Sequence, residues 1–246
     1  MKIRGSIVLV TGANQGIGQA YVRSLLAAGA ARVYGADVRL DWLEEAAKAE
    51  EKRLVPICLD IRDGEKVAAT ASRCKDVNLL INNAAITQHT GLIRAASLDR
   101  AHAIMDTNYF GTLQMCRAFA PVLKANGGGM IVNVLSIAAL AHIPRVGPYS
   151  ASKAAELSMT QGVRAELAAQ GTKVLAVLPG PVDTPISAHR PLPKAPPSEI
   201  AEATLGAVEA EREELYPDAI AREVYESFRK DPKALERRFA AQLPEA

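Results

Sequence analysis

The chain has 246 residues, 49% of them hydrophobic and 23% charged, and its formal net charge is +2. This length and composition are typical of one globular α/β domain with a full core. The small net charge gives no reason to expect a nucleic acid or an acidic membrane surface as partner. No apolar run approaches the ~18 residues of a membrane span.

The three cysteines, Cys58, Cys74 and Cys116, form neither a CxxC pair nor a metal-ligand spacing. This pattern favours a reducing, cytoplasmic location and no metal site. Cys58 lies in an apolar run, so we expect it in the core. The apolar run after Met1 is too short for a signal peptide and is interpreted as a first strand.

Short β-branched runs alternate with longer helical patterns over most of the chain. The expected strands are 7–10, 32–36, 54–59, 78–81, 130–135 and 173–178, and the expected helices are 17–28, 40–52, 63–74, 98–126 and 150–169. The strands lack polar alternation, as expected for strands buried on both faces of a parallel sheet. The order predicts a Rossmann-type doubly wound parallel sheet, a three-layer α/β/α fold, in a single domain over 1–246.

The last quarter of the chain has a different composition. Seven of the 14 prolines fall between Pro179 and Pro197, which excludes a helix or a central strand there. We expect a Pro-rich substrate lid at about 185–197, then a helix from Ser198 and a short strand near Leu215. A helical C-terminal tail is expected at about 217–243.

A glycine-rich run, Thr11-Gly-Ala-Asn-Gln-Gly-Ile-Gly18, follows the first expected strand and opens the first expected helix. Glycines allow a tight turn and a close approach to a pyrophosphate, and the helix N-terminus attracts its charge. A lone run of this kind is as often an ordinary loop, but its place after the first strand favours a dinucleotide site.

Asp37 ends the second expected strand, where a carboxylate can bind the adenosine ribose hydroxyls and repel a 2′-phosphate. Arg39 complicates this interpretation, because a guanidinium can pair with that phosphate or simply be a solvated loop charge. The sequence therefore favours NAD and leaves NADP open.

Tyr149 and Lys153 lie four residues apart in a helical segment, so they share one face. A nearby cation favours the phenolate form of a tyrosine. Such a phenol can move a proton onto or off an oxygen while a dinucleotide moves hydride, which points to redox chemistry at an alcohol or carbonyl.

Together these motifs resemble the short-chain dehydrogenase/reductase family, in its single-domain branch of about 250 residues. The resemblance covers about residues 6 to 184. Its motifs occur in family order: the glycine loop to Gly18, Asp60, Asn82-Asn-Ala-Ala85, Asn108, Ser136, Tyr149-x-x-x-Lys153 and Pro179-Gly-Pro-Val-Asp-Thr184.

The resemblance implies four catalytic residues. Tyr149 is the general acid in reduction and the base in oxidation, and Ser136 donates a hydrogen bond to the same substrate oxygen. Lys153 tunes the phenol and holds the nicotinamide ribose, while Asn108 anchors a water in a proton relay. Taken singly, Ser136 and Asn108 would be turn or capping residues and Tyr149 a buried aromatic; the ordered set favours catalysis.

The resemblance also implies a cofactor site. Asp60 would contact the adenine edge beside Ile61, although it could instead cap the helix after Asp63. The family more often has glycine at position 85, and alanine fits there if φ stays negative. The expected cofactor-binding residues are Gly12, Asn14, Gln15, Gly16, Ile17, Gly18, Asp37, Arg39, Asp60, Ile61, Asn82, Ala84, Tyr149, Lys153, Pro179, Gly180, Val182 and Thr184.

The expected substrate pocket is mainly apolar, which suits a ketone, an aldehyde or a secondary alcohol with hydrocarbon groups. Its expected wall is Ile86, Ile137, Ile143 and Ile186, joined by Pro181 and Val182. Four basic or titratable loop residues could instead bind a carboxylate or polar head, although such residues are more often solvated: Arg145, His142, His89 and His189.

The sequence therefore predicts an NAD(P)-dependent oxidoreductase, NAD favoured, that interconverts an alcohol and a carbonyl of a small molecule. Two alternatives are an epimerase or dehydratase on the same fold, and a non-catalytic dinucleotide-binding sensor. The C-terminal tail differs from that of many relatives, which end in a strand and an Asp-Gly-Gly turn. We nevertheless expect a homo-oligomer, a dimer or a tetramer, paired through the long helices.

Overall fold

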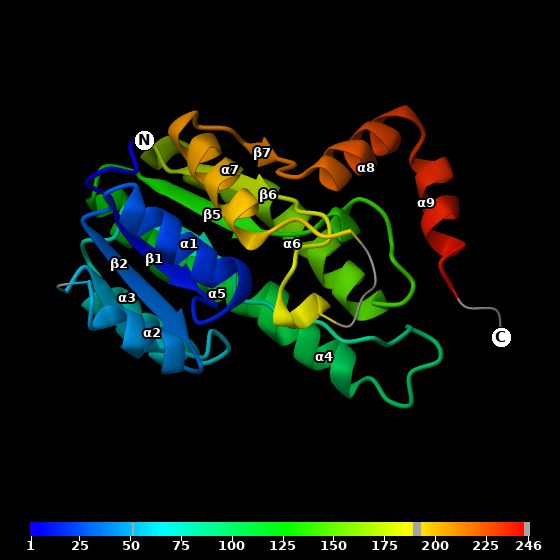
Figure 1. Ribbon diagram of the computed structural model, residues 1–246, viewed down its shortest axis with the longest axis horizontal. Helices are drawn as coiled ribbons and strands as arrows, with labels where there is room; N and C mark the ends of the chain where they lie inside the picture. The colour runs from blue at the N-terminus through cyan, green and yellow to red at the C-terminus, as the bar shows by residue number, and fades with distance from the viewer. Residues whose placement is uncertain (51, 189–192, 244–246) are drawn as a thin grey trace.

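Seven parallel strands form one sheet in the computed structural model, which describes residues 1–50, 52–188 and 193–243 (Figure 1). The order across the sheet is β3-β2-β1-β4-β5-β6-β7. The strands are β1 (Ile7–Thr11), β2 (Arg32–Asp37), β3 (Leu54–Cys58), β4 (Leu79–Asn82), β5 (Met130–Val134), β6 (Lys173–Val177) and β7 (Glu214–Leu215). This topology confirms the predicted Rossmann-type fold.

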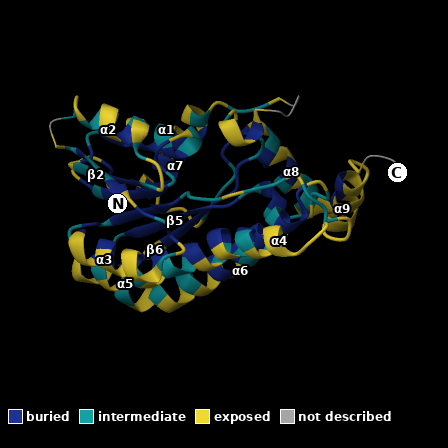
Figure 2. Ribbon diagram, turned by 90° about the horizontal axis from the view of Figure 1, so that it is seen from below, coloured by how far each residue is buried: buried dark blue, intermediate teal, exposed yellow. Residues whose placement is uncertain are grey.

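The helices cover both faces of the sheet (Figure 2). One face carries α1 (Gly16–Ala27), α2 (Asp41–Ala47) and α7 (Pro197–Glu209); the other carries α3 (Gly64–Arg73), α5 (Thr112–Ala125) and α6 (Gly147–Leu167). Within β1, Val8 and Val10 pack in the core on the α1 side, whereas Leu9 packs in the core on the α5 side. Both faces are buried, which explains why the strand sequences lack polar alternation.

The segment predicted as one helix over 98–126 is interrupted. It consists of α4 (Asp99–Met105), a π-helical turn (Asp106–Gly111) and α5. Gly111 ends the π-turn against Ile61: a Cβ added there would lie 2.7 Å from the Ile61 Cγ1 atom. Periodicity alone does not reveal such a turn, because it depends on this tertiary contact.

Two other helices differ from their predicted bounds. Helix α2 ends at Ala47, earlier than predicted, and Lys52 beyond it has a positive φ of 71°. Helix α6 begins at Gly147, three residues before the predicted start. The earlier start places Tyr149 in the first turn of α6, next to the carboxyl ends of the strands.

The C-terminal segment forms α8 (Ala219–Lys230) and α9 (Pro232–Ala240), at the end of the sheet where β6 leads into its loop (Figure 1). Both helices contribute to a separate apolar cluster with Ile137 and Leu140 of the segment after β5. The tail therefore packs against a segment that was expected to line the substrate pocket.

Two expectations need comment. Cys58 is exposed at the end of the edge strand β3, so its predicted place in the core is wrong. The predicted lid at 185–197 falls partly on residues 189–192, which lie outside the described residues. Its described ends include a 3₁₀ turn at Pro185–Ser187 and a bridge between Val182 and Ala195.

Across the described ranges, no helix is long and apolar enough to span a membrane.

Candidate active site

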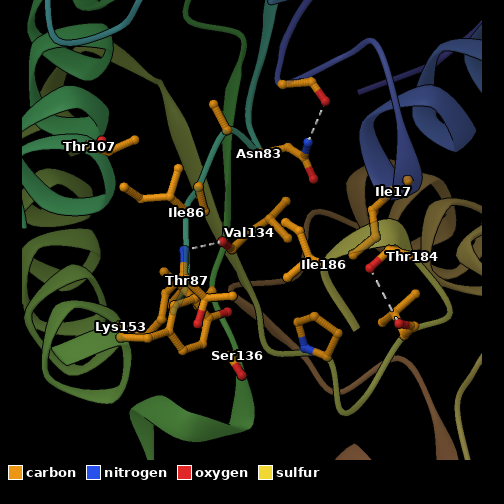
Figure 3. Close-up of a pocket in the computed structure, with 18 of the residues that line it drawn as sticks. Ile17, Asn83, Ile86, Thr87, Thr107, Val134, Ser136, Lys153, Thr184 and Ile186 are labelled. Atoms are coloured by element: carbon orange, nitrogen blue, oxygen red, sulfur yellow. Dashed lines mark hydrogen bonds between the residues drawn. The ribbon is translucent and has the colours of Figure 1, made fainter. Parts of the chain in front are cut away.

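A cleft of about 460 Å³ opens at the carboxyl ends of the strands, above β1 and β4 (Figure 3). The chain proceeds from β1 outward to β3 and then returns to β4 on the other side of β1, so this is the topological switch point of the sheet. Ligands of doubly wound sheets bind at this place, because the connecting loops diverge there.

Ser136, Tyr149 and Lys153 all line this cleft. Ser136 follows β5, and its Oγ accepts a hydrogen bond from the Ala138 N–H at 3.1 Å, which caps a short 3₁₀ turn. Tyr149 and Lys153 lie one turn apart on α6, with the Lys153 Nζ atom 5.7 Å from the centre of the Tyr149 ring. The predicted hydroxyl, phenol and ammonium are thus brought together.

The Lys153 ammonium has partners that the sequence analysis did not foresee. Its Nζ donates to the Val134 carbonyl oxygen at 3.0 Å (Figure 3). It also lies 3.0 Å from the Glu156 carboxylate. Both charged side chains are only 2% exposed. Burial raises the pKa of the Glu156 carboxyl to about 7, and the neighbouring Lys153 opposes this rise. The i, i+3 spacing was visible in the sequence, but the burial was not.

Asn108 is fully buried in the π-turn and does not line the cleft. Its Oδ1 accepts from the Ile86 N–H, and its Nδ2 donates to the Ile86 carbonyl at 3.0 Å and to the Ser152 Oγ at 2.9 Å. These bonds use both amide N–H groups. The Asn108 side chain therefore joins the loop after β4 to α6, and a water of the expected relay would have to be held by its main chain.

The glycine loop fits closely between β1 and β4. A Cβ added to Gly12 would lie 2.8 Å from the Ala84 Cα, and one added to Gly18 would lie 2.0 Å from the Gly12 carbonyl oxygen. Gln15 precedes α1 in an extended conformation and makes no side-chain capping bond. The first N–H groups of α1 therefore remain available to an anion.

Some loop residues predicted to bind cofactor support the cleft instead of lining it. Gln15, Gly16 and Ile17 line it with Gly12, whereas Gly18 packs beneath the loop. The Asn14 Oδ1 accepts from the Trp42 and Leu43 N–H groups at 3.0 and 3.1 Å, so this side chain holds the start of α2. Asn14 and Gly18 therefore support the shape of the loop, and their contacts with a cofactor stay predictions.

The side chains of Asp37 and Arg39, at the end of β2, have different surroundings. Asp37 lines the cleft, and its carboxylate accepts from the Asn14 N–H at 3.0 Å and the Arg39 N–H at 3.1 Å. The Arg39 guanidinium is outside the lining and pairs with the exposed Asp41 at 3.1 Å. The acidic group therefore faces the cleft, and the basic group does not.

Asp60 and Ile61 line the cleft after β3, together with Arg62, which the sequence analysis missed. The Arg62 guanidinium binds both oxygens of Asp60 and lowers the pKa of that carboxyl. Helix α3 is capped by Asp63, whose carboxylate accepts from the Lys66 N–H, so Asp60 is not the cap.

The side chains of Asn82 and Asn83 point in different directions at the end of β4. The Asn82 side chain points into the interior and donates to the Asn133 Oδ1 at 2.9 Å, so any contact of this residue with the cofactor would have to be made by its main chain. Asn83 lines the cleft, and its Nδ2 donates to the carbonyl oxygens of Thr11 and Gly12 at 3.0 and 3.1 Å (Figure 3). This pair of bonds clamps the glycine loop to the end of β4.

The chain after β6 completes the cleft with Pro179, Gly180, Val182 and Thr184. The Gly180 N–H donates to the buried Asp218 carboxylate at 2.8 Å, so the N-cap of α8 holds this turn in place. The sequence analysis did not find Asp218, because this contact joins residues 38 positions apart.

A family model described as short chain dehydrogenase matches residues 6–194, well over half of the chain. The chain belongs to the short-chain dehydrogenase family. It is therefore an oxidoreductase, and its cofactor is a nicotinamide dinucleotide.

Individual family members are similar over most of their length. A sorbitol dehydrogenase of Cereibacter sphaeroides is 37% identical over 74% of this chain and 73% of its own. A 2-(R)-hydroxypropyl-CoM dehydrogenase of Xanthobacter autotrophicus is 32% identical over 75% and 77%. The structure is similar to that of a short chain dehydrogenase from Burkholderia cenocepacia J2315 in complex with NADP, with a TM-score of 0.92 and 43% identity over 99% and 100% of the two chains.

In this short-chain dehydrogenase, the four isoleucines predicted for the substrate side all line the cleft: Ile86, Ile137, Ile143 and Ile186. The Arg145 guanidinium lies outside the lining and donates to the Gln242 carbonyl oxygen near the end of α9. His89 and His142 are also outside the lining, and His189 lies outside the described residues. Alanine fits at position 85, because Ala85 is not among the described residues with positive φ.

Proposed function

We propose that this short-chain dehydrogenase interconverts an alcohol and the corresponding ketone or aldehyde of a mainly apolar small molecule, with NAD as its preferred cofactor. The supporting observation is that Ser136, Tyr149 and Lys153 share one cleft with the glycine loop and the open N-terminus of α1. A bound dinucleotide supplies the hydride, and the protein supplies position and proton transfer.

The residues of the chain divide the proton chemistry. The Tyr149 hydroxyl gives its proton to the substrate oxygen in reduction and accepts one in oxidation. The Ser136 Oγ accepts from Ala138, which leaves its own hydrogen available to donate to the same oxygen. This bond polarises the carbonyl and stabilises the charge that develops on its oxygen. The nearby Lys153 ammonium adds positive charge beside the phenol.

The glycine loop fits the proposed cofactor. Gly12 packs tightly against Ala84, and a Cβ added to Gly16 would lie 3.1 Å from the Thr184 side chain. The loop therefore has room for backbone atoms but not for side chains at these two positions. Such a surface allows close approach of a pyrophosphate. The N-terminus of α1 would hold the phosphates, and Thr184 would lie beside the nicotinamide.

The position of Asp37 favours NAD. Two backbone N–H groups fix its carboxylate in the cleft, where it would accept from the ribose hydroxyls and repel a 2′-phosphate. The test is titration of NADH and NADPH against wild type, Asp37→Asn and Arg39→Ala. We expect tighter NADH binding in wild type and a smaller preference in Asp37→Asn. Loss of NADPH affinity in Arg39→Ala would show instead that Arg39 leaves Asp41 to bind the phosphate.

The isoleucine wall supports an apolar substrate. Ile86 and Ile186 are 41% and 47% exposed, on the two loops that flank the cleft. Ile137 and Ile143 lie on the segment that α8 and α9 pack against. Burying these side chains against hydrocarbon favours binding by roughly 25 cal/mol per Å² of apolar surface.

The deciding experiment compares Tyr149→Phe with Tyr109→Phe. Both variants lose one phenolic oxygen, but Tyr109 is not in the cleft lining. We expect NADH oxidation with apolar ketones to fall by roughly 10²–10⁴-fold in Tyr149→Phe, the usual contribution of a general acid. Dinucleotide affinity should survive in both variants, and turnover should survive in Tyr109→Phe.

Other outcomes would point to the alternatives. Retained turnover in Tyr149→Phe would refute the mechanism. Tight dinucleotide binding without turnover on any alcohol or carbonyl would favour a sensor, and conversion of a substrate without net oxidation would favour an epimerase or dehydratase.

We also propose that the enzyme is one domain and acts as a homo-oligomer in the cytoplasm. Phe110 is 50% exposed in the π-turn that leads into α5 and packs edge-on against Tyr109, which supports a contact between subunits there. The three cysteines are free thiols, as expected in a reducing compartment. Light scattering of wild type and Phe110→Asp tests the assembly, since a monomeric wild type would refute it.

A further inference from the structure

Three oxygen atoms lie close to the Lys153 ammonium. The Val134 carbonyl oxygen and both oxygens of the Glu156 carboxylate lie 3.0 Å from its Nζ. An ammonium group has three N–H donors. Val134 and the Glu156 Oε2 atom each accept one of these donors. The charge of an ionised Glu156 attracts the ammonium to this side, so a cofactor ribose competes with the carboxylate for Lys153.

The surroundings of the Glu156 carboxyl do not fully stabilise its ionised form. It is almost fully buried, and its Oε1 makes no hydrogen bond within the described part of the chain. A buried ionised carboxyl is costly unless it is paired and fully hydrogen-bonded. Burial raises its pKa toward neutrality. This carboxyl therefore holds its proton to a higher pH than an exposed glutamate does.

The other groups around Glu156 stay uncharged. Cys116 on α5 interacts electrostatically with Glu156, but burial raises the pKa of this thiol to about 12. On β5, the neutral Asn133 amide reaches the same helix turn by donating to the Thr160 Oγ at 2.9 Å. Lys153 is thus the charged partner on which the state of Glu156 acts.

We propose that Glu156 is a positioning residue for Lys153: when ionised it draws the ammonium away from the cofactor, and when protonated it releases the ammonium to the nicotinamide ribose. This inference rests on the ribose-binding role of Lys153 in the proposed function. It assigns to Glu156 a pH-dependent control of dinucleotide affinity, and the consequence follows from linkage. If the dinucleotide binds better when Glu156 is protonated, then dinucleotide binding favours protonation of Glu156 to the same degree.

The magnitude follows from the bond that Lys153 regains. Recovery of one charge-assisted hydrogen bond corresponds to about a tenfold gain in affinity. The affinity for NADH should therefore fall by about tenfold as the pH rises through neutrality. A tenfold preference shifts the titration midpoint by about one pH unit, so binding at about pH 7.5 should take up roughly half a proton.

Calorimetry measures this uptake directly. NADH and NADPH are titrated into the wild-type enzyme at about pH 7.5 in two buffers with different ionisation enthalpies, and the difference in heat gives the protons bound. The Glu156→Gln variant keeps a hydrogen-bond acceptor but cannot ionise, so it should take up none of this half proton. Glu166→Gln removes an exposed carboxyl from the same helix and should behave as wild type.

The outcomes separate this inference from the proposed function. Binding of a dinucleotide by wild type without proton uptake, or uptake that persists in Glu156→Gln, would overturn the role of Glu156 alone. If Glu156→Gln does not fold, the wild-type measurement and the Glu166→Gln control decide. A chain that binds neither dinucleotide would refute the proposed function and this inference with it. Turnover is not needed for any of these readings.

Discussion

Replacing Asp218 with alanine should weaken both the fold and dinucleotide binding, because one carboxylate serves two elements. Asp218 is 2% exposed, and its oxygens accept from the Gly180 N–H and the Ala221 N–H, each at 2.8 Å. The second bond caps α8, and the first fixes the turn after β6 at the edge of the cleft.

The cost can be worked out from these two bonds. Loss of an N-cap costs about 1 kcal/mol. Leaving the half-buried Gly180 N–H without its partner adds roughly 1–3 kcal/mol. A total near 3 kcal/mol lowers the Tm of a chain of 246 residues by roughly 6–12 °C, at about 2–4 °C per kcal/mol.

Asp231→Ala is a matched control. Asp231 caps α9 by accepting from the Ala234 N–H at 3.0 Å, but it is exposed and makes no contact with the turn after β6. We expect a Tm loss of only roughly 2–4 °C there and unchanged NADH affinity. Thermal unfolding and NADH titration are measured on both variants. Equal Tm losses, or unchanged NADH affinity in Asp218→Ala, would show that the Gly180 bond does not hold the cleft.

Three further outcomes are expected. Gly18→Ala should abolish dinucleotide binding in a titration, because the added Cβ would lie 2.0 Å from the Gly12 carbonyl oxygen. Gly162→Ala is the control: the space around its added Cβ is open, so binding should be unchanged. Of the three thiols, only the exposed Cys58 should react rapidly with an alkylating reagent at about pH 8, because burial raises the pKa of the Cys74 and Cys116 thiols. Mass spectrometry measures the reaction, and rapid reaction of a second thiol would argue against this expectation. Burial raises the pKa of Glu156 in the folded chain from 4.5 to about 7. Between these two pH values the folded chain therefore binds more protons than the unfolded chain. The contribution of this carboxyl to the free energy of unfolding should then fall as the pH rises through that range. Denaturant unfolding of wild type and Glu156→Gln across pH should show a difference that changes in this sense, and a constant difference would contradict it.

The strands and the glycine loop were predictable because their signals are local. A buried parallel strand needs a continuous apolar run, and the turn into α1 needs glycine at Gly12 and Gly16, where φ is 63° and 57°. The predicted strand bounds agree with the structure to within one residue at each end. The spacing of Tyr149 and Lys153 likewise fixed their common helix face.

The side chains whose directions the sequence left undecided are those whose environment is set by distant partners. Asn82 and Asn83 are identical and adjacent, and only the alternation of side chains along β4 decides which one enters the core. Arg39 can face a phosphate or Asp41, and its pairing with Asp41 depends on where α2 begins.

The sequence by itself determined the fold and predicted the residues that meet in the cleft, because periodicity and turn chemistry act over a few residues. Only the tertiary structure decided how those groups are held. Asp218 accepts a hydrogen bond from Gly180, 38 positions away in the sequence. Glu156 and Lys153 form an ion pair that is buried from water. Burial changes the energy of a charge by far more than its neighbours in sequence do, and burial is a property of the packed chain.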